Sequence, residues 1–178
     1  MSVTDRTIVL AGATSASGLA VARSLVASGA RVIATGRSAE RLEPLRVIGV
    51  EVEVADATSL DEMTELAARL ERVDAVLPLV GGWRGGGGLA GQSDADFAAL
   101  LPALDAVRAT SRAFDEALRA APAGRFAIIS STAVGRPLAG GANYAAVKAA
   151  SEAWARAVAQ GFAKAAREAG EPLRAASV

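Results

Sequence analysis

The stretch TIVLAGATSASG, Thr7 to Gly18, decides the fold. Its first half, Thr7–Ala11, is an unbroken run of apolar and β-branched residues, which predicts a buried strand. Its second half contains two glycines, and a helical pattern then runs from Ser17 to Ser28, where Gly29 ends it. A strand, a glycine-containing loop and a helix in this order predict the first βα unit of a parallel sheet.

The same alternation of short apolar runs and helical stretches continues along the whole sequence. Predicted strands cover residues 7–11, 31–35, 50–54, 75–80, 125–130 and 173–178, and predicted helices cover 17–28, 39–47, 59–71, 94–120 and 141–170. Short apolar strands separated by helices are typical of βαβ units. Because such crossovers are right-handed, we expect an α/β fold with one doubly wound parallel sheet and ligands at the carboxyl ends of its strands. Six strands are visible, with the sixth truncated at the C-terminal edge, and residues 1–178 are expected to form a single domain.

Composition excludes several classes of protein. The 178 residues include no Cys and no His, which rules out disulfides, thiol nucleophiles, Ser-His-Asp triads and the usual zinc ligands, so no metal is expected. Nineteen basic residues balance nineteen acidic ones, which gives no reason to expect nucleic acid or an anionic membrane as a partner. The polar start does not resemble a signal peptide, and no apolar run reaches the ~18 residues of a membrane span. We therefore expect a cytoplasmic protein that acts on a small molecule.

The loop after the first predicted strand has the features of a phosphate-binding loop. Gly12 lets the chain leave the strand sharply, and Gly18 lets the helix approach the sheet closely. The free N–H groups at the start of the helix favour a pyrophosphate, and the hydroxyl groups of Thr14, Ser15 and Ser17 add donors. The loop therefore predicts a dinucleotide site, and the alternative is an ordinary strand-to-helix turn.

Arg37 and Asp56 follow the second and third predicted strands. A dinucleotide-binding unit meets the adenosine ribose after its second strand, where an acidic residue binds the 2′-hydroxyl of NAD and an Arg accommodates the 2′-phosphate of NADP. Arg37 therefore favours NADP over NAD, and the alternative is a solvated Arg at the end of a strand. Asp56 is placed either to accept a hydrogen bond from the adenine amino group or to form a plain turn.

Tyr144 and Lys148 are four residues apart in a predicted helix, so they project from one face of it. Ser131 follows the fifth predicted strand and precedes Tyr144 by thirteen residues, so the three side chains can meet at the carboxyl edge of the sheet. Reduction of a carbonyl requires a proton as well as a hydride. A phenol normally has a pKa of about 10, and a neighbouring ammonium lowers it toward the operating pH. The three residues therefore predict a carbonyl/alcohol site, unless Tyr144 is a core aromatic residue and Lys148 a surface charge.

These motifs resemble the short-chain dehydrogenases/reductases over essentially the whole chain. Gly12-x-x-x-Ala16-x-Gly18, Asp56, Ser131 and Tyr144-Ala-Ala-Val-Lys148 stand where that family has its cofactor loop, its adenine contact and its catalytic Ser, Tyr and Lys. The resemblance implies Rossmann topology and hydride transfer between a nicotinamide cofactor and a carbonyl/alcohol or iminoquinonoid substrate. It implies that Tyr144 is the general acid/base, that Lys148 also binds the nicotinamide ribose, and that Ser131 binds the substrate oxygen. The residues expected to bind the cofactor are Gly12, Thr14, Ser15, Ala16, Ser17, Gly18, Arg37, Asp56, Ala57, Val80, Gly81, Gly82, Tyr144 and Lys148.

The sequence departs from the family pattern at three places. Ala16 replaces the middle glycine of the loop, where its methyl group would crowd the pyrophosphate. Leu104 replaces an Asn that would hold a water between Lys148 and bulk solvent, and Pro78-Leu79-Val80-Gly81 replaces the usual Asn-Asn-Ala-Gly. The run Val80-Gly81-Gly82-Trp83 is locally similar to the dihydropteridine reductase branch of the family. Trp83 is expected beside the nicotinamide or substrate, or else in an exposed loop or a dimer contact.

The leading hypothesis is an NADP-preferring oxidoreductase, with NAD as the alternative cofactor. A second hypothesis is a cofactor-binding sensor or scaffold with little catalysis, which the changes at Leu104 and after the fourth strand favour. A third is an α/β domain that binds no dinucleotide. The Ala-rich predicted helices 94–120 and 141–170 correspond to the dimer interface of the resembling family. We therefore expect a homodimer or homotetramer, unless these helices merely cover the sheet.

Overall fold

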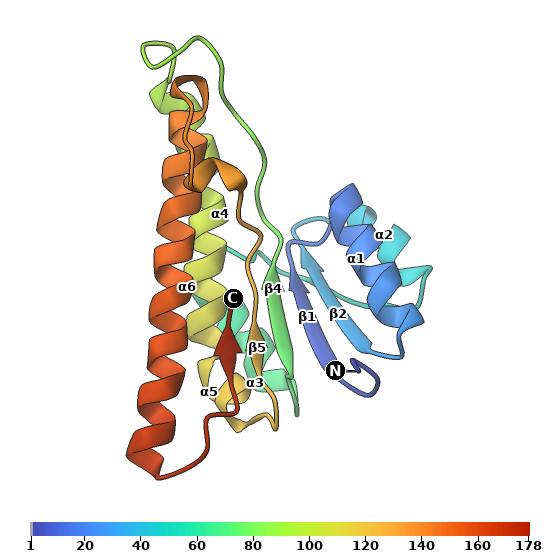
Figure 1. The fold of residues 1–178 in the computed structure, drawn as a ribbon. Coiled ribbons are helices and arrows are strands. Elements are labelled where there is room, and N and C mark those ends of the chain that lie inside the picture. Colours follow the sequence, from blue (N-terminus) through green and yellow to red (C-terminus); the bar gives the residue numbers. More distant parts are fainter. Residues whose placement is uncertain (1) are drawn as a thin grey trace.

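The computed structural model describes residues 2–178 and confirms the α/β fold class (Figure 1). Within this range six strands form one sheet in the order β3-β2-β1-β4-β5-β6, and all neighbouring strands are parallel. The strands are β1 (Thr7–Ala11), β2 (Arg31–Gly36), β3 (Glu51–Val54), β4 (Ala75–Pro78), β5 (Arg125–Phe126) and β6 (Ala176–Ser177). The order reverses between β1 and β4, so the crevice expected of a doubly wound sheet lies at their carboxyl ends.

Helices cover both faces of this sheet. They are α1 (Ala16–Ala27), α2 (Ala39–Arg46), α3 (Leu60–Arg69), α4 (Asp94–Ala113), α5 (Asp115–Ala120) and α6 (Ala142–Ala169), with short 3-10 turns η1 (Thr132–Val134) and η2 (Ala139–Gly141). Ile8 and Leu10 of β1 pack in the cluster formed with α1 and α2, whereas Val9 and Ala11 pack in the cluster formed with α3, α4 and α6. Figure 1 shows the two groups of helices on opposite sides of the sheet. None of the helices in residues 2–178 is both long and apolar enough to cross a membrane.

The predicted helix 94–120 is wrong in one respect, because the chain breaks at Phe114. Phe114 has φ −104° and ψ 6°, and it separates α4 from α5. Its side chain is fully buried in the core cluster. The chain turns there so that this ring faces the sheet, and tertiary packing overrides the local helical preference.

The predicted fifth strand, 125–130, is also too long. Only Arg125 and Phe126 pair with β4, and the last bond on that side runs from the N–H of Ala127 to the carbonyl of Val76. The next donor in a parallel ladder would be residue 78, which is Pro78 and has no N–H. Residues that follow Ile128 therefore leave the sheet, and the sixth strand pairs with β5 only over Ala176 and Ser177.

A buried carboxylate joins the start of β1 to the start of β4. Oδ1 of Asp74 accepts hydrogen bonds from Arg6 (2.9 Å) and Arg72 (2.8 Å), and Oδ2 accepts one from the backbone N–H of Thr7 (2.9 Å). The Asp74 side chain is only 2% exposed. Burial by itself would raise the pKa of Asp74, but the hydrogen bonds from Arg72, Thr7 and Arg6 together hold that pKa below its usual value of 3.8.

Asp74→Ala should destabilise the fold by about 2 kcal/mol at neutral pH, because it leaves the buried N–H of Thr7 without an acceptor and two arginines without their anion. The folded pKa lies below the unfolded one, so this stability is present above pH 3.8 and is lost as the pH falls through the folded value. Urea unfolding at a series of pH values measures both effects. The matched control is Glu51→Ala, which removes the exposed pair with Arg31 and should cost about 0.5 kcal/mol. Equal losses in the two variants would contradict the assignment.

Candidate active site

The chain leaves β1 through a turn that only glycine fits. Gly12 has φ +80°, and a Cβ there would lie 2.4 Å from Cγ2 of Val80. The backbone N–H of Gly12 donates to Oγ1 of Thr35 (3.1 Å), and the N–H of Ala13 donates to the Thr35 carbonyl (2.9 Å). Thr35 is fully buried in β2. The neighbouring strand therefore fixes the path of the loop.

The loop then enters α1 with its amide groups directed at the crevice. Ser15 is the N-cap of α1, and its Oγ accepts the N–H of Gly18 (3.1 Å). A Cβ on Gly18 would lie 2.1 Å from the carbonyl oxygen of Ala13, so the helix packs directly on the loop. The other N–H groups of the first turn have no acceptor within the helix. They carry the partial positive charge that favours a phosphate group.

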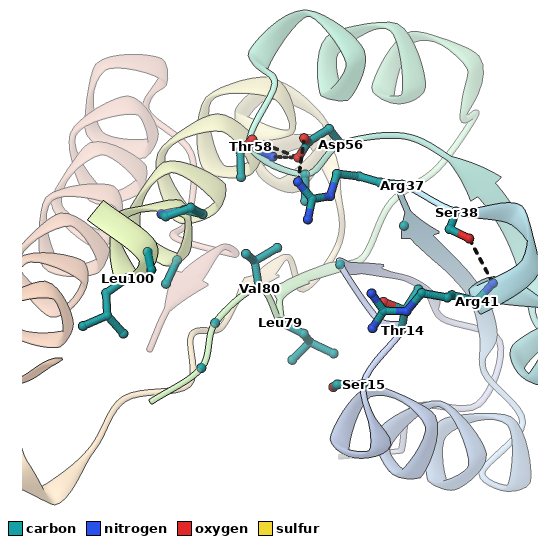
Figure 2. A pocket seen from close by; sticks show the side chains of 18 of the residues that line it. Thr14, Ser15, Arg37, Ser38, Arg41, Asp56, Thr58, Leu79, Val80 and Leu100 are labelled. Carbon is teal, nitrogen blue, oxygen red and sulfur yellow. Dashed lines mark hydrogen bonds and ion pairs between the residues drawn. The ribbon is translucent and has the colours of Figure 1, made fainter. Parts of the chain in front are cut away.

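A cavity of about 400 Å³ opens beside this loop (Figure 2). Predicted cofactor-binding residues that line it are Gly12, Thr14, Ser15, Arg37, Asp56, Ala57, Val80, Gly81 and Gly82. Arg41, at the start of α2, lines it as well and was missed by the sequence analysis. Arg41 belongs to a helix that carries several charged residues, and its position in the sequence does not distinguish it from them.

Three arginines, Arg37, Arg41 and Arg84, and the carboxylate of Asp56 supply the charge of this cavity. Nη1 of Arg37 lies 3.9 Å from Oδ2 of Asp56, and the Arg37 side chain is 79% exposed. Oδ1 of Asp56 accepts hydrogen bonds from the N–H (2.9 Å) and hydroxyl (2.8 Å) of Thr58. Figure 2 shows Arg37 reaching toward Asp56 while Arg41 lies nearer Thr14. Asp56 thus forms the turn that was one of its two predicted roles, and its second oxygen faces Arg37.

A second cavity, of about 260 Å³, adjoins the first and holds the Tyr–Lys pair. Ser17, Tyr144 and Lys148 line it. The two cavities share Ser15 and the stretch 79–82 as lining, so they adjoin at the carboxyl ends of β1 and β4, and the pair is called the groove below. The structure therefore brings the predicted phosphate loop and the predicted catalytic helix to one site.

Tyr144 and Lys148 lie on the same face of α6, as their spacing predicts. Nζ of Lys148 is 5.8 Å from the centre of the Tyr144 ring and donates a hydrogen bond of 2.5 Å to the carbonyl of Ile129. Burial lowers the pKa of Lys148 below the ordinary value of 10.5. The ammonium is therefore held by a carbonyl at the mouth of the groove, close to the only tyrosine of the chain.

Four predicted residues do not line either cavity. Ser131 is half-buried, and its hydroxyl accepts the N–H of Ala133 (3.2 Å) at the start of η1. Trp83 is 62% exposed on the loop after β4. Gly18 lies buried beneath the loop, and Ala16 is exposed on the first turn of α1. Their predicted contacts with cofactor or substrate remain predictions.

Leu104 lies where the sequence analysis placed the missing Asn. It packs with Tyr144 against the small cluster of Leu100, Ala103 and Val147, which joins α4 to α6. Leu104 and Tyr144 therefore pack against the same apolar cluster. No amide group is available at this position to hold a water near Lys148.

The glycine-rich loop between β4 and α4 is fastened to the start of α6 by Gln92, a residue that the sequence analysis missed. Nε2 of Gln92 donates to the carbonyls of Gly86 (2.9 Å) and Gly140 (3.1 Å), and its Oε1 accepts the N–H of Asn143 (3.2 Å). The N–H of Gly86 also donates to the Gly140 carbonyl (2.7 Å). Figure 1 shows this green segment running beside the start of α6. A Gln at the end of a glycine-rich stretch gives no signal in the sequence that it makes these contacts.

Comparisons with known proteins identify the family of the chain. A family model described as short chain dehydrogenase matches residues 6–166, and the chain belongs to that family. No curated protein is significantly similar to it in sequence.

Solved structures share the fold over most of the chain. An oxidoreductase from Escherichia coli superposes with a TM-score of 0.85 at 22% identity, covering 99% of this chain and 74% of that one. A short chain dehydrogenase from Salmonella enterica serovar Typhi gives 0.82 at 23% identity, covering 91% and 72%. A metagenomic short-chain oxidoreductase in complex with NADP gives 0.77 at 31% identity, covering 92% and 79%.

Proposed function

We propose that the protein is an NADP-preferring oxidoreductase that transfers a hydride between the nicotinamide and a small carbonyl or alcohol substrate. The observation that carries the proposal is the pair of adjoining cavities, one lined by Gly12 and Arg37 and the other by Tyr144 and Lys148, which share Ser15 and residues 79–82. The 31% identical metagenomic oxidoreductase, which was solved in complex with NADP, supports the choice of cofactor. The proposal treats residues 1–178 as a single NAD(P)-binding domain.

The residues present fit a dinucleotide. At Gly12 a Cβ would occupy the turn beside Val80, and at Gly36 it would lie 2.5 Å from Cγ2 of Thr14, so both glycines keep the loop open and close to β2. The amide groups at the start of α1 suit a pyrophosphate, and Arg37 with Arg41 suits an additional phosphate. Asp56, Ala57 and Val80 line the part of the cavity where the adenine is expected.

The catalytic roles follow from the second cavity. A bound nicotinamide nucleotide would supply or accept the hydride. Tyr144 would donate a proton from its phenolic oxygen to the carbonyl oxygen of the substrate during reduction, and would accept it in the reverse direction. The ammonium of Lys148, held near the ring by Ile129, favours the phenolate that remains. In the proposal the hydroxyl of Ser131 turns from the Ala133 N–H to hold the substrate oxygen.

Arg37→Ala should weaken NADPH binding about tenfold and change NADH binding less than twofold, because an Arg–phosphate contact exists only for the 2′-phosphate. Fluorescence titration of the protein with each nucleotide measures both constants. Arg69→Ala is the matched control, because Arg69 is paired with Glu53 on the surface outside the groove and should leave both constants unchanged. Equal binding of NADPH and NADH by the wild type would overturn the preference, and binding of neither would overturn the proposed function.

A cofactor-binding sensor or scaffold is the second candidate. Leu104 beside Tyr144 favours it, because that position offers no polar group to relay a proton. The two candidates differ in turnover: a sensor binds NADPH but reduces no member of a panel of aldehydes, ketones and quinonoid imines.

The proposal includes a homodimer or homotetramer through α4 and α6. Trp154 of α6 contacts α4 on this helix pair: its Nε1 donates to Oγ of Ser111 (2.9 Å), and its ring lies 5.4 Å from the Arg108 guanidinium. A cavity between the same helices remains open to solvent in the single chain. Light scattering of the purified protein tests this part, and a strict monomer at micromolar concentration contradicts it.

A further inference from the structure

The segment that carries Ser131 is not held by the sheet. The β5 ladder with β4 ends at Ala127, and the last bond to the β6 side is from the N–H of Ile128 to the carbonyl of Val178 (2.9 Å). Within residues 2–178 the backbone N–H groups of Ile129, Ser130 and Ser131 donate to no other group. Backbone pairing therefore leaves the position of Ser131 free to vary, although the reaction proposed above requires it to be fixed.

Two side chains of α6 hold this segment instead. Lys148 donates from Nζ to the carbonyl of Ile129, and Glu152 accepts through Oε1 a hydrogen bond of 2.5 Å from the hydroxyl of Ser130. Lys148 and Glu152 are four residues apart, so they lie one turn apart on the same face of the helix. The Glu152 side chain is 30% exposed, and its other oxygen lies 3.5 Å from Nη1 of Arg156.

The contacts made by Lys148 and Glu152 have different relations to the proposed reaction. Lys148 has a role of its own in the proposed reaction and is not available as a purely structural support. Glu152 lines neither part of the groove, and among residues 2–178 its side chain contacts only Ser130 and Arg156 through polar atoms. Its polar contact with the reaction site therefore runs through the segment 129–131.

We propose that Glu152 is a positioning residue, which fixes the segment 129–131 against α6 through Ser130 and thereby sets the place of the Ser131 hydroxyl and of the Ile129 carbonyl that holds Lys148. This inference rests on the proposed function for its effect on catalysis. The holding of the segment does not depend on that function. Glu152 acts through a charge-assisted hydrogen bond, which is stronger than a bond between neutral groups.

Two measurements on the full chain test it. Glu152→Ala and Ser130→Ala should each lower kcat about tenfold or more, since small displacements of a substrate-positioning group have effects of this size, and should change the NADPH dissociation constant less than twofold. Amide exchange is measured without nucleotide. In both variants the amide protons of Ala133 and Val134, whose acceptors both belong to Ser131, should exchange about tenfold faster than in the wild type. The N–H of Leu79, bonded to Ala11, is the internal reference and should not change.

Three further variants separate positioning from general support of the helix. Glu152→Gln keeps an oxygen that can accept from Ser130, and should restore most of the lost kcat. Arg156→Ala removes the other partner of Glu152 and should have no effect on kcat. The double variant Ser130→Ala/Glu152→Ala should be no slower than either single variant, because both remove the same bond.

The outcomes are distinct. Unchanged amide exchange in Glu152→Ala, unchanged kcat, or additive losses in the double variant would each overturn the positioning role. If the wild type binds nucleotide but turns over no substrate, the proposed function fails, and the exchange rates alone decide whether Glu152 holds the segment.

Discussion

Tyr144→Phe should lower kcat about 1,000-fold and leave NADPH binding within twofold of the wild type, since a positioned general acid contributes about 10²- to 10⁴-fold to rate. The substitution removes one oxygen and keeps the ring, which packs on the cluster of Leu100, Ala103 and Val147. The shape of the groove and the environment of Lys148 are therefore retained. Single-turnover hydride transfer, followed by loss of nicotinamide absorbance, measures the effect directly.

The control for Tyr144→Phe lies on the same helix. Glu168→Gln changes an exposed residue near the end of α6 that forms an ion pair with Lys164, and kcat should not change. Turnover by Tyr144→Phe at more than about a tenth of the wild-type rate would show that another group delivers the proton. A simultaneous loss of NADPH binding would show instead that the phenol shapes the cofactor site.

Gly18→Ala should weaken NADPH binding about 100-fold and cost about 3 kcal/mol of stability, because the added methyl group displaces the start of α1 from the loop. Its Cβ would lie 2.1 Å from the carbonyl oxygen of Ala13 and 2.6 Å from its carbonyl carbon. Both are backbone atoms of the loop, so no side chain can rotate to relieve the contact. The helix must shift, and the amide groups of its first turn shift with it.

Gly135→Ala is the matched control for Gly18→Ala. Gly135 has φ −76°, and a Cβ there would have no neighbour closer than the carbonyl oxygen of Thr132 at 3.9 Å. Thermal unfolding and nucleotide titration of the two variants measure the difference. Wild-type NADPH affinity in Gly18→Ala would show that the loop does not carry the pyrophosphate.

Much of the fold could be predicted because the buried strands of a parallel sheet appear in the sequence as continuous apolar runs. Every residue of β1 is buried, and all five predicted helix starts coincide to within one residue with the observed starts of α1, α2, α3, α4 and α6. Ser15, Ser38, Ser59 and Ser93 each cap a helix through a side-chain bond to the backbone, and such caps are local signals. These features depend on neighbours in the sequence, so a single sequence reveals them.

The prediction errors lie at positions whose conformation depends on residues far away in the sequence. The break at Phe114 depends on burial of its ring, and the short β5 depends on the missing N–H of Pro78 in the neighbouring strand. For the site, type and spacing pointed to Gly12, Arg37 and the Tyr144–Lys148 pair, which line the two cavities, and their roles stay predictions. Arg41, Gln92 and Glu152 were not predictable, because each gains its place from a contact between segments far apart in the chain.

The position of β1 at the centre of the sheet has a consequence for how the chain folds. On one side β1 pairs with β2, where Ile8 lies opposite Val32, and on the other side it pairs with β4, where Ile8 lies opposite Ala75. The second partner is therefore synthesised 67 residues after Ile8, and the hydrogen bond between Thr7 and Asp74 spans the same separation. Closing a loop of that length before its contacts form slows folding. On a ribosome, the unit β1–α1–β2–α2–β3 is complete while one edge of β1 is still unpaired. That open edge, Thr7–Ala11, is the most apolar strand of the chain, and it must stay shielded until β4 arrives.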